Sequence, residues 1–271
     1  MDRPSICTNR SADGVEPFRL LDLTLPSAAE NLALDEALLN EMDEHGGDPV
    51  LRFWESDHYF VVLGRASRLR DDVYTEACRQ DNIAVLRRAS GGGTVLQGPG
   101  CLSYALVLRL EWHSALRDIR RTNRFILERI AQALRRWEPE LAFREVSDLA
   151  VNGFKISGNA QRRTRRALLF HGTILHGLPI ALVSRYLQEP RRQPAYRTGR
   201  PHGQFLRTID APLQDMKQAI AAAWNVRSTV AGLPMPRLQS AIATVVHRST
   251  EETEEGDATH PIHSIVKAGV P

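Results

Sequence analysis

One lysine lies among small, turn-forming residues where its ammonium group could act on a ligand. Lys155 follows Asn152-Gly153 in the segment NGFKISGNAQ, and Ser157 and Gly158 come shortly after it. A compact ammonium can stabilise charge on a phosphate and on the carbonyl oxygen of an activated acyl group at the same time. Taken alone, the segment is more typical of a surface lysine in a hairpin, so its meaning depends on the rest of the chain.

A run of three glycines, Gly91–Gly93, follows the strand-like segment IAVLRRAS. Consecutive glycines expose backbone N–H groups and allow a ligand to approach closely, which suits a phosphate or a carboxylate. Arg87 and Arg88 add bidentate donors for the same anion, and we expect only one of them to face it, because neighbouring strand residues point to opposite faces. No GxxxxGK[ST] pattern occurs, so this is not a P-loop. A bulged hairpin turn is the alternative reading.

The composition excludes several classes of protein. A net charge of +3 over 271 residues does not by itself favour nucleic-acid binding, and the clustered arginines of 117–124, 162–166 and 191–200 are typical of solvated faces. The N-terminal residues lack the apolar core of a secretory signal, and no apolar run is long enough to span a bilayer. Three cysteines without CxxC spacing predict a cytoplasmic protein without structural disulfides or a zinc site.

The elements that must position these residues alternate strands and turns more often than strands and helices. This pattern predicts an α+β fold, with a mixed, largely antiparallel sheet and packed helices. Ser27 and Glu30 form a predicted capping box before a helix, and PVLRFWES and YFVVLGR are expected to pair as a hairpin. A meander of three strands is expected within 145–175, and helices over 116–137, 212–224 and 236–247.

Three segments in a fixed order resemble the lipoate–protein ligase family, within the superfamily of lipoate and biotin ligases and octanoyltransferases. They are RRASGGGTV, then GFKISGNAQRR about sixty residues later, then FHGTIL, and the earlier NLALDEALL and VVLGR also match. The resemblance covers about 18–210 and implies a fold like the catalytic domain of biotin ligases. The chain is accordingly divided into a disordered 1–16, a ligase-like catalytic domain over 17–210, a helical extension over 211–249, and a disordered acidic tail over 250–271.

The resemblance implies that ATP activates lipoate or octanoate to an acyl-adenylate, whose acyl group then passes to a lysine of a lipoyl carrier domain or an H-protein-like acceptor. Lys155 is the implied catalytic residue, bridging the phosphate and the acyl carbonyl. Mg²⁺ is expected with ATP, without identified ligands. The other residues implied to line the acyl and adenylate site are Arg87, Arg88, Ser90, Gly91, Gly92, Gly93, Thr94, Ser157, Gly158, Ala160, His171 and Gly172.

Departures from the family pattern keep two other functions open. Gln97, Gly98 and Cys101 stand where many of these ligases carry His-Asp and Gly-Asn, which alters the nucleotide and metal contacts. An ATP-independent octanoyl or lipoyl transferase or amidotransferase would use Cys101 as a thiolate, with His171 or Lys155 lowering its pKa. A non-catalytic binding module is the third reading. From the length that follows residue 207, we expect the accessory domain of the larger ligases to be absent, reduced, or supplied by another chain.

The basic segments QRRTRR and RRQPAYRTGR flank the implied site in sequence. Carrier domains of this type tend to be acidic around the modified lysine, so these arginines are expected to guide docking by long-range attraction. Arg162 and Arg163 are the residues on which this expectation rests.

Overall fold

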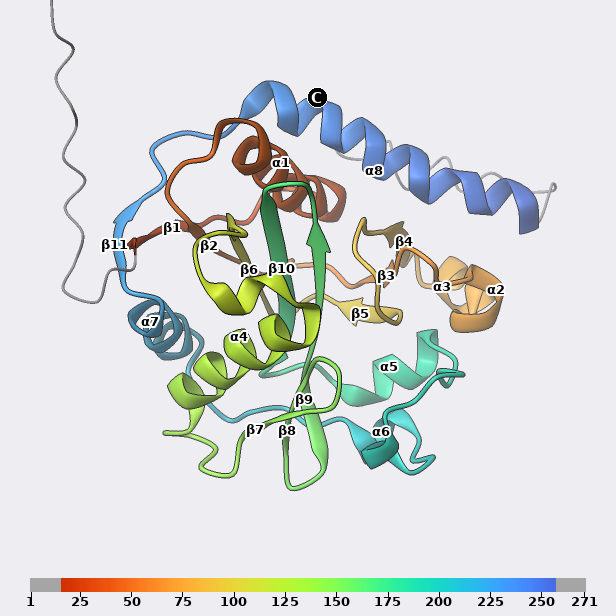
Figure 1. The fold of residues 1–271 in the computed structure, drawn as a ribbon. Coiled ribbons are helices and arrows are strands. Elements are labelled where there is room, and N and C mark those ends of the chain that lie inside the picture. The colour runs from red at the N-terminus through yellow and green to blue at the C-terminus, as the bar shows by residue number, and fades with distance from the viewer. Residues whose placement is uncertain (1–15, 257–271) are drawn as a thin grey trace, which may run out of the picture.

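A mixed sheet of eight strands runs through the middle of the molecule, in the order β11-β1-β2-β6-β10-β9-β8-β7 (Figure 1). The computed structural model describes residues 16–256, with side chains for 16–250. Neighbouring strands pair antiparallel except β1, which runs parallel to both β2 and β11. The strands are β1 (Phe18–Asp22), β2 (Val50–Trp54), β6 (Cys101–Arg109), β7 (Ala142–Arg144), β8 (Asp148–Val151), β9 (Phe154–Arg163), β10 (Ala167–Leu175) and β11 (Val226–Thr229).

A second sheet of three strands, β4-β3-β5, carries the glycine run at one end. Its strands are β3 (Phe60–Leu63), β4 (Ala84–Arg87) and β5 (Val95–Gln97). The predicted hairpin between PVLRFWES and YFVVLGR is therefore wrong, because β2 lies between β1 and β6 while β3 lies between β4 and β5. Both edges of β2 are occupied and all of its residues are buried, so no edge remains for β3. Alternation in sequence identifies strands but does not identify their partners.

Helices cover both faces of the large sheet and produce two apolar cores (Figure 1). On one face α4 and α7 pack against alternate residues of β6, such as Leu106 and Leu108. On the other face α1 and α8 pack against the intervening residues, such as Ala105 and Val107, together with the second sheet. The helices are α1 (Ala28–His45), α2 (Leu69–Asp72), α3 (Thr75–Gln80), α4 (Ile119–Leu134), α5 (Ile180–Tyr186), α6 (His202–Phe205), α7 (Leu213–Ala223) and α8 (Met235–Gly256), with 3-10 turns η1 (Ser114–Arg117) and η2 (Ala195–Arg197).

The α+β fold, the meander of β8, β9 and β10, and the capping box of α1 are confirmed. Ser27 caps helix α1, where its side chain accepts the backbone N–H of Glu30. The Glu30 carboxylate in turn accepts the backbone N–H of Ser27. The helix expected over 116–137 begins later, because Asp118 caps α4 and η1 forms the preceding turn.

Helix α8 runs to Gly256, past the predicted end at 247 and into the segment predicted to be a disordered tail. The remainder of that tail, and nearly all of the predicted disordered N-terminus, lie outside the described residues. Within the described range, no helix combines the length and the apolar character needed to cross a bilayer.

Candidate functional site

The hairpin that carries Lys155 is closed by a tight two-residue turn. Asn152 and Gly153 have φ values of 49° and 81°, a left-handed conformation that asparagine and glycine adopt at low cost. Strand β9 begins at Phe154, so Lys155 is the second residue of a strand, and the turn lies just before it.

A β-bulge determines which way Lys155 points. Ser157 pairs with Leu149 and Lys155 pairs with Ala150, so β9 contains one extra residue, Ile156. In a regular strand, residues three positions apart face opposite sides of the sheet. The extra residue places Lys155 on the same face as Gly158, where a Cβ at Gly158 would lie 3.0 Å from both Cε and Nζ of the lysine. A side chain at position 158 would therefore push the end of the lysine aside by a few tenths of an ångström.

Lys155 is held by an ion pair. Its Nζ lies 2.8 Å from Oδ1 of Asp148 on β8, and the Tyr196 hydroxyl donates to Oδ2 of the same carboxylate at 2.8 Å. The lysine side chain is 25% exposed. An anionic ligand can therefore reach the ammonium, but it must compete with Asp148.

Arg88 is a buried cation without a carboxylate partner among the described side chains. Its guanidinium donates to the hydroxyl of Ser90 and to the carbonyl oxygens of Gly91, Gly93 and Val62. Burial, with a smaller contribution from the charge of Arg87, lowers the pKa of Arg88 to about 10. A bound anion would relieve both effects, so the site is suited to a phosphate or a carboxylate.

The two adjacent arginines bond to different groups, as alternation along a strand requires. Arg87 donates to the carbonyl oxygens of Gly64, Arg65 and Ser67, whereas Arg88 donates to the glycine run and Val62. Its backbone N–H donates to the hydroxyl of Ser249 on α8 at 3.0 Å.

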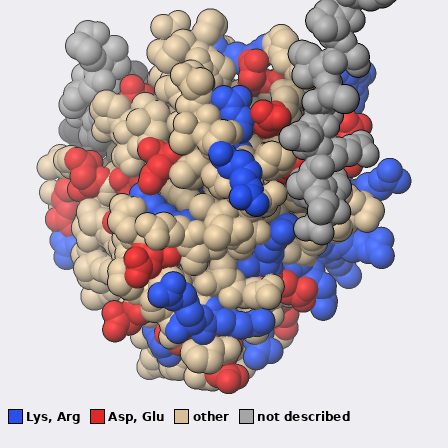
Figure 2. Space-filling view, turned by 90° about the vertical axis from the view of Figure 1, so that its left-hand side faces the viewer, with Lys and Arg blue, Asp and Glu red and all other residues tan. Residues whose placement is uncertain are grey.

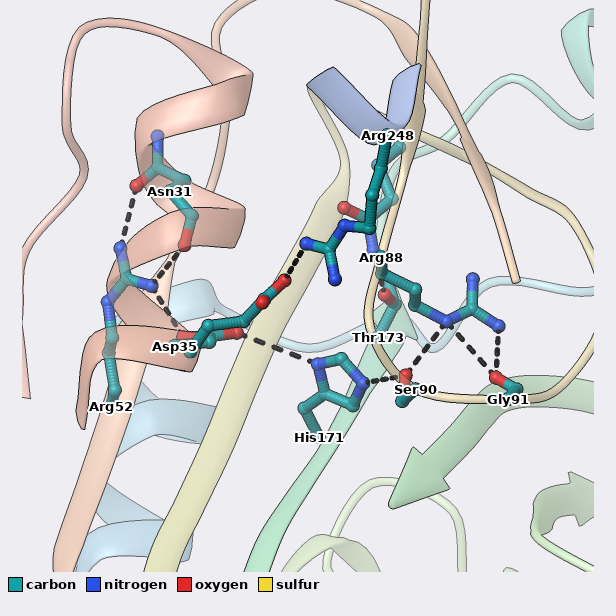
Figure 3. Close-up of polar contacts among 11 residues, drawn as sticks. Asn31, Asp35, Arg52, Arg88, Ser90, Gly91, His171, Thr173 and Arg248 are labelled. Carbon is teal, nitrogen blue, oxygen red and sulfur yellow. Dashed lines mark hydrogen bonds and ion pairs between the residues drawn. The ribbon is translucent and has the colours of Figure 1, made fainter. Parts of the chain in front are cut away.

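His171 connects the glycine loop to helix α1 through a chain of polar contacts (Figure 3). Its Nε2 lies 2.6 Å from Oγ of Ser90, and its Nδ1 lies 3.6 Å from Oδ2 of Asp35. Asp35 is bonded in turn to the fully buried Arg52, whose guanidinium also donates to Asn31. Burial alone would raise the pKa of Asp35, but Arg52 and the His171 contact outweigh it and lower that pKa.

Asp35, Arg52 and Asn31 were missed at the sequence level. Asn31 and Asp35 lie one helical turn apart inside the apolar run NLALDEALL, and Arg52 interrupts the apolar strand VLRFW. Charged residues at positions where the pattern demands burial are the signal that could have identified them, since buried charges are normally paired.

Strands β9 and β10 place four of the implied site residues on one face, namely Lys155, Gly158, Ala160 and His171. Gly158 pairs with Thr173 and Ala160 with His171, so these four share the face on which Lys155 lies. Gly92 lies against this face, since a Cβ there would be 3.7 Å from that of Ala160. Thr94 is turned away, donating to Asp72 at 2.6 Å, and Ser157 is buried beside Asn159 on the opposite face.

Gly172 is required by close packing behind this face. A Cβ at position 172 would lie 1.7 Å from Oδ1 of Asn159, whose side chain is held by the Tyr104 hydroxyl and the carbonyl oxygen of Ser147. We expect Gly172→Ala to displace Asn159 and to lower the free energy of unfolding by about 1–3 kcal/mol, the usual range for overpacking. Urea unfolding measures this loss. Gly203→Ala is the matched control, because a Cβ there meets no atom within 4 Å.

Cys101 does not have the surroundings of an activated thiolate. It is 1% exposed at the start of β6, and burial together with the charge of Glu55 raises its pKa to about 12. Neither His171 nor Lys155 is among the groups that shift this pKa. The alternative assignment of Cys101 as nucleophile is therefore disfavoured.

Cys101→Ala is accordingly expected to retain near-wild-type acylation of a carrier and to lose only a little stability. The reason is that the thiol fills core volume and holds no proton that the chemistry needs. Rates measured alongside thermal melts check this. A collapse of the rate at an unchanged melting temperature would restore Cys101 as a reacting group.

Arg162 and Arg163 are held by the chain itself. Arg162 donates to the carbonyl oxygen of Ala89 at 3.1 Å, and Arg163 donates to Leu116 and Thr122 ahead of and within α4. The view from the side of β11 and α7 shows basic and acidic side chains interspersed, without one continuous basic surface (Figure 2). Guidance of a carrier by these two arginines stays a prediction.

Within the described residues, no group of three or more His, Cys, Asp or Glu side chains is arranged to hold a metal ion. Gln97, one of the residues at which the chain departs from the family pattern, donates to Thr173 of β10 at 2.9 Å.

This chain matches a known protein family and several named relatives. Residues 27–224 match the model of the "Lipoyl protein ligase A/B catalytic domain". An octanoyltransferase LipM of Exiguobacterium is 31% identical over 58% of this chain and 65% of that protein, and the LipM of Bacillus subtilis is 30% identical over 59% and 66%. A protein named lipoate-protein ligase A in Aeropyrum pernix is 31% identical over 58% and 56%. The matches thus span between 56% and 66% of the length of these relatives, less than two thirds of each.

Solved structures share the fold. A bipartite lipoate protein ligase from Thermoplasma acidophilum superposes with a TM-score of 0.72 at 22% identity, covering 88% of this chain and 95% of that one. A lipoate-protein ligase A bound with ATP superposes with a TM-score of 0.69 at 22% identity, covering 84% and 94%. With the motifs in order, the fold shared, and the family match extending over well more than half of its residues, this chain belongs to the lipoyl protein ligase A/B catalytic domain family.

Proposed function

We propose that this chain attaches a lipoyl or octanoyl group to a lysine of a lipoyl carrier protein. The observation that carries the proposal is the pair of cationic groups on one face of the sheet: Lys155 above Gly158, and the Arg88 guanidinium, which has no carboxylate partner among the described side chains. Such groups stabilise the negative charge that develops during acyl transfer. A carrier as partner is also supported by the Thermoplasma acidophilum ligase, whose structure is described with its E2 lipoyl domain.

The ligase form of this function, expected from the sequence, uses ATP to make an acyl-adenylate. Arg88 and the N–H groups of Gly91–Gly93 would hold phosphate oxygens, and Lys155 would meet the phosphate and the acyl carbonyl. Bound ATP would supply the adenylate as leaving group. The comparisons do not confirm this form, because the matched relatives include octanoyltransferases as well as ligases.

The transferase form takes the acyl group from a thioester without ATP, and the names of the LipM relatives favour it. It needs no adenylate, but a covalent route would need a nucleophile. Cys78 and Cys101, the cysteines within the described residues, are both buried, and burial raises their pKa values to about 11 and about 12. Neither is suited to form the acyl-enzyme.

The test is acylation of a purified lipoyl carrier domain, followed by intact mass. One arm supplies ATP, Mg²⁺ and either lipoate or octanoate, and a second supplies an octanoyl thioester without ATP. A mass gain in the first arm supports the ligase, and a gain in the second supports the transferase. No gain in either arm, together with steeply salt-dependent nucleic-acid binding, would favour the non-catalytic module instead.

A further inference from the structure

Three side chains from three elements form a hydroxyl–imidazole–carboxylate chain. Ser90 Oγ lies 2.6 Å from His171 Nε2, and His171 Nδ1 lies 3.6 Å from Asp35 Oδ2 (Figure 3). Asp35 is fixed from behind by Arg52, at 2.5 Å. The order of groups is that of a serine nucleophile, a general base and an orienting carboxylate, an arrangement recognised by its geometry rather than by its place in sequence.

The neighbouring hydrogen-bond donors and acceptors determine where the protons of the Ser90 hydroxyl and the His171 ring lie. The guanidinium of Arg88 has donors only, so Ser90 Oγ accepts from Arg88 Nε at 3.1 Å and has its own proton available for His171. The Asp35 carboxylate is acceptor-only when ionised, so a neutral imidazole directs its N–H from Nδ1 toward Asp35. Nε2 is then left as the acceptor for the serine proton. This is the direction of hydrogen bonding that activates a serine.

The glycine loop that follows Ser90 is open on one side. A Cβ placed on Gly91 or on Gly93 would meet no atom within 4 Å, so the backbone that follows Ser90 borders open space. Arg88, directly beside Oγ, supplies a fixed positive charge to an oxyanion forming there. Ser90 itself is 2% exposed, which keeps bulk water away from the hydroxyl.

We propose that Ser90 is a nucleophile that carries the acyl group between an activated acyl donor and the carrier lysine. The proposal rests on the proposed function and supplies a nucleophile for its transferase form, since Cys78 and Cys101 are both buried. Ser90 Oγ forms a bond to the acyl carbonyl carbon of a thioester, and the C–S bond breaks. The serine proton passes to His171 Nε2 and then to the departing thiolate.

The second half of the reaction reverses these roles. The carrier amine bonds to the acyl carbon, the ester C–O bond breaks, and the proton lost by the amine returns through His171 to Ser90 Oγ. No oxidant, metal or further reactant is needed. Asp35 acts as a positioning residue, because its carboxylate pairs with His171 and with Arg52 rather than with the reacting hydroxyl.

The experiment traps the acyl-serine in the absence of carrier. The protein is mixed with octanoyl-coenzyme A or with p-nitrophenyl octanoate, quenched in acid, and analysed by intact mass and peptide mapping. We expect one octanoyl group on the peptide containing Ser90, lost in Ser90→Ala and His171→Ala and retained in Cys101→Ala. Ser90→Cys should restore an adduct at position 90, now a thioester, which guards against a folding defect of the alanine variant. Asp35→Asn should lower kcat for nitrophenolate release with little change in KM.

An adduct at another residue, or none with either donor, overturns the proposal. So does carrier acylation by a folded Ser90→Ala variant at the wild-type rate, and in that case the proposed function survives without the acyl-serine. An adduct at Ser90 in a protein that acylates no carrier has the opposite meaning, supporting the nucleophile and contradicting the proposed function. The experiment can therefore contradict the acyl-serine without contradicting carrier acylation, and the reverse.

Discussion

Replacing Lys155 by alanine is expected to lower the rate of carrier acylation by roughly 10²–10³-fold, the scale for losing one preorganised electrostatic donor. The bulge at Ile156 holds the ammonium over Gly158. In the proposed function it would meet there the charge that develops on the acyl oxygen and on any phosphate. Lys155→Arg should not fully restore the rate, because a planar guanidinium is a poor substitute for a point charge over a glycine. The rate of carrier acylation, followed by intact mass, is measured for the wild type, Lys155→Ala and Lys155→Arg.

A stability control is needed because Lys155 has a structural partner. Its loss leaves Asp148, which is largely buried, with the Tyr196 hydroxyl as its remaining side-chain donor. The double variant Lys155→Ala with Asp148→Asn removes the unpaired charge, so its melting temperature should approach that of the wild type while its rate remains low. A rate that recovers with the melting temperature would assign Lys155 a structural role only.

Replacing Arg52 by methionine is expected to lower the free energy of unfolding by about 3–5 kcal/mol, the usual cost of breaking a buried ion pair by removing one partner. Arg52 is 0% exposed and Asp35 2% exposed, so the substitution leaves a carboxylate in a dry interior, with His171 as its remaining ionisable partner among the described side chains. Urea unfolding followed by circular dichroism measures the loss.

A double variant shows whether the stability is lost through the broken ion pair or through poorer packing. Arg52→Met combined with Asp35→Leu replaces the pair by apolar side chains, which should recover much of the lost stability. Acylation should remain impaired in the double variant, since His171 has lost its orienting carboxylate. If the double variant is no more stable than Arg52→Met alone, the loss arises from packing around the guanidinium stem and the pairing argument is wrong.

The sequence was sufficient for the fold class, because the glycine run, the lysine segment and the His-Gly strand are local patterns in a fixed order. It was not sufficient for the direction of Lys155. Strand periodicity places residues 155 and 158 on opposite faces, and only the pairing of β9 with β8 reveals the extra residue that reverses this. A bulge depends on the partner strand, which a single run of residues does not contain.

The series of polar contacts that links Ser90, through His171 and Asp35, to Arg52 could not be predicted from local sequence either. Its members come from α1, β2, β10 and the loop after β4, and each has an ordinary explanation by itself. His171 in a strand is typically a satisfied polar residue, and Asp35 in a helix is typically solvated. The same limit produced the wrong hairpin, since Val50–Trp54 and Phe60–Leu63 both read as strands without any indication that they belong to different sheets.

The parallel pairing of β1 with β11 has a consequence for how the chain reaches this fold during synthesis. The first strand, Phe18–Asp22, cannot pair with β11 until Val226–Thr229 has left the ribosome. The apolar side of α1 is covered later still, when Leu238 and Val245 of α8 have been synthesised. Contacts of such long sequence separation form late and leave strand edges open to wrong partners meanwhile. A nascent chain that has already made its entire catalytic face therefore still depends on its last described elements to close the sheet, and we expect it to need protection from aggregation until they emerge.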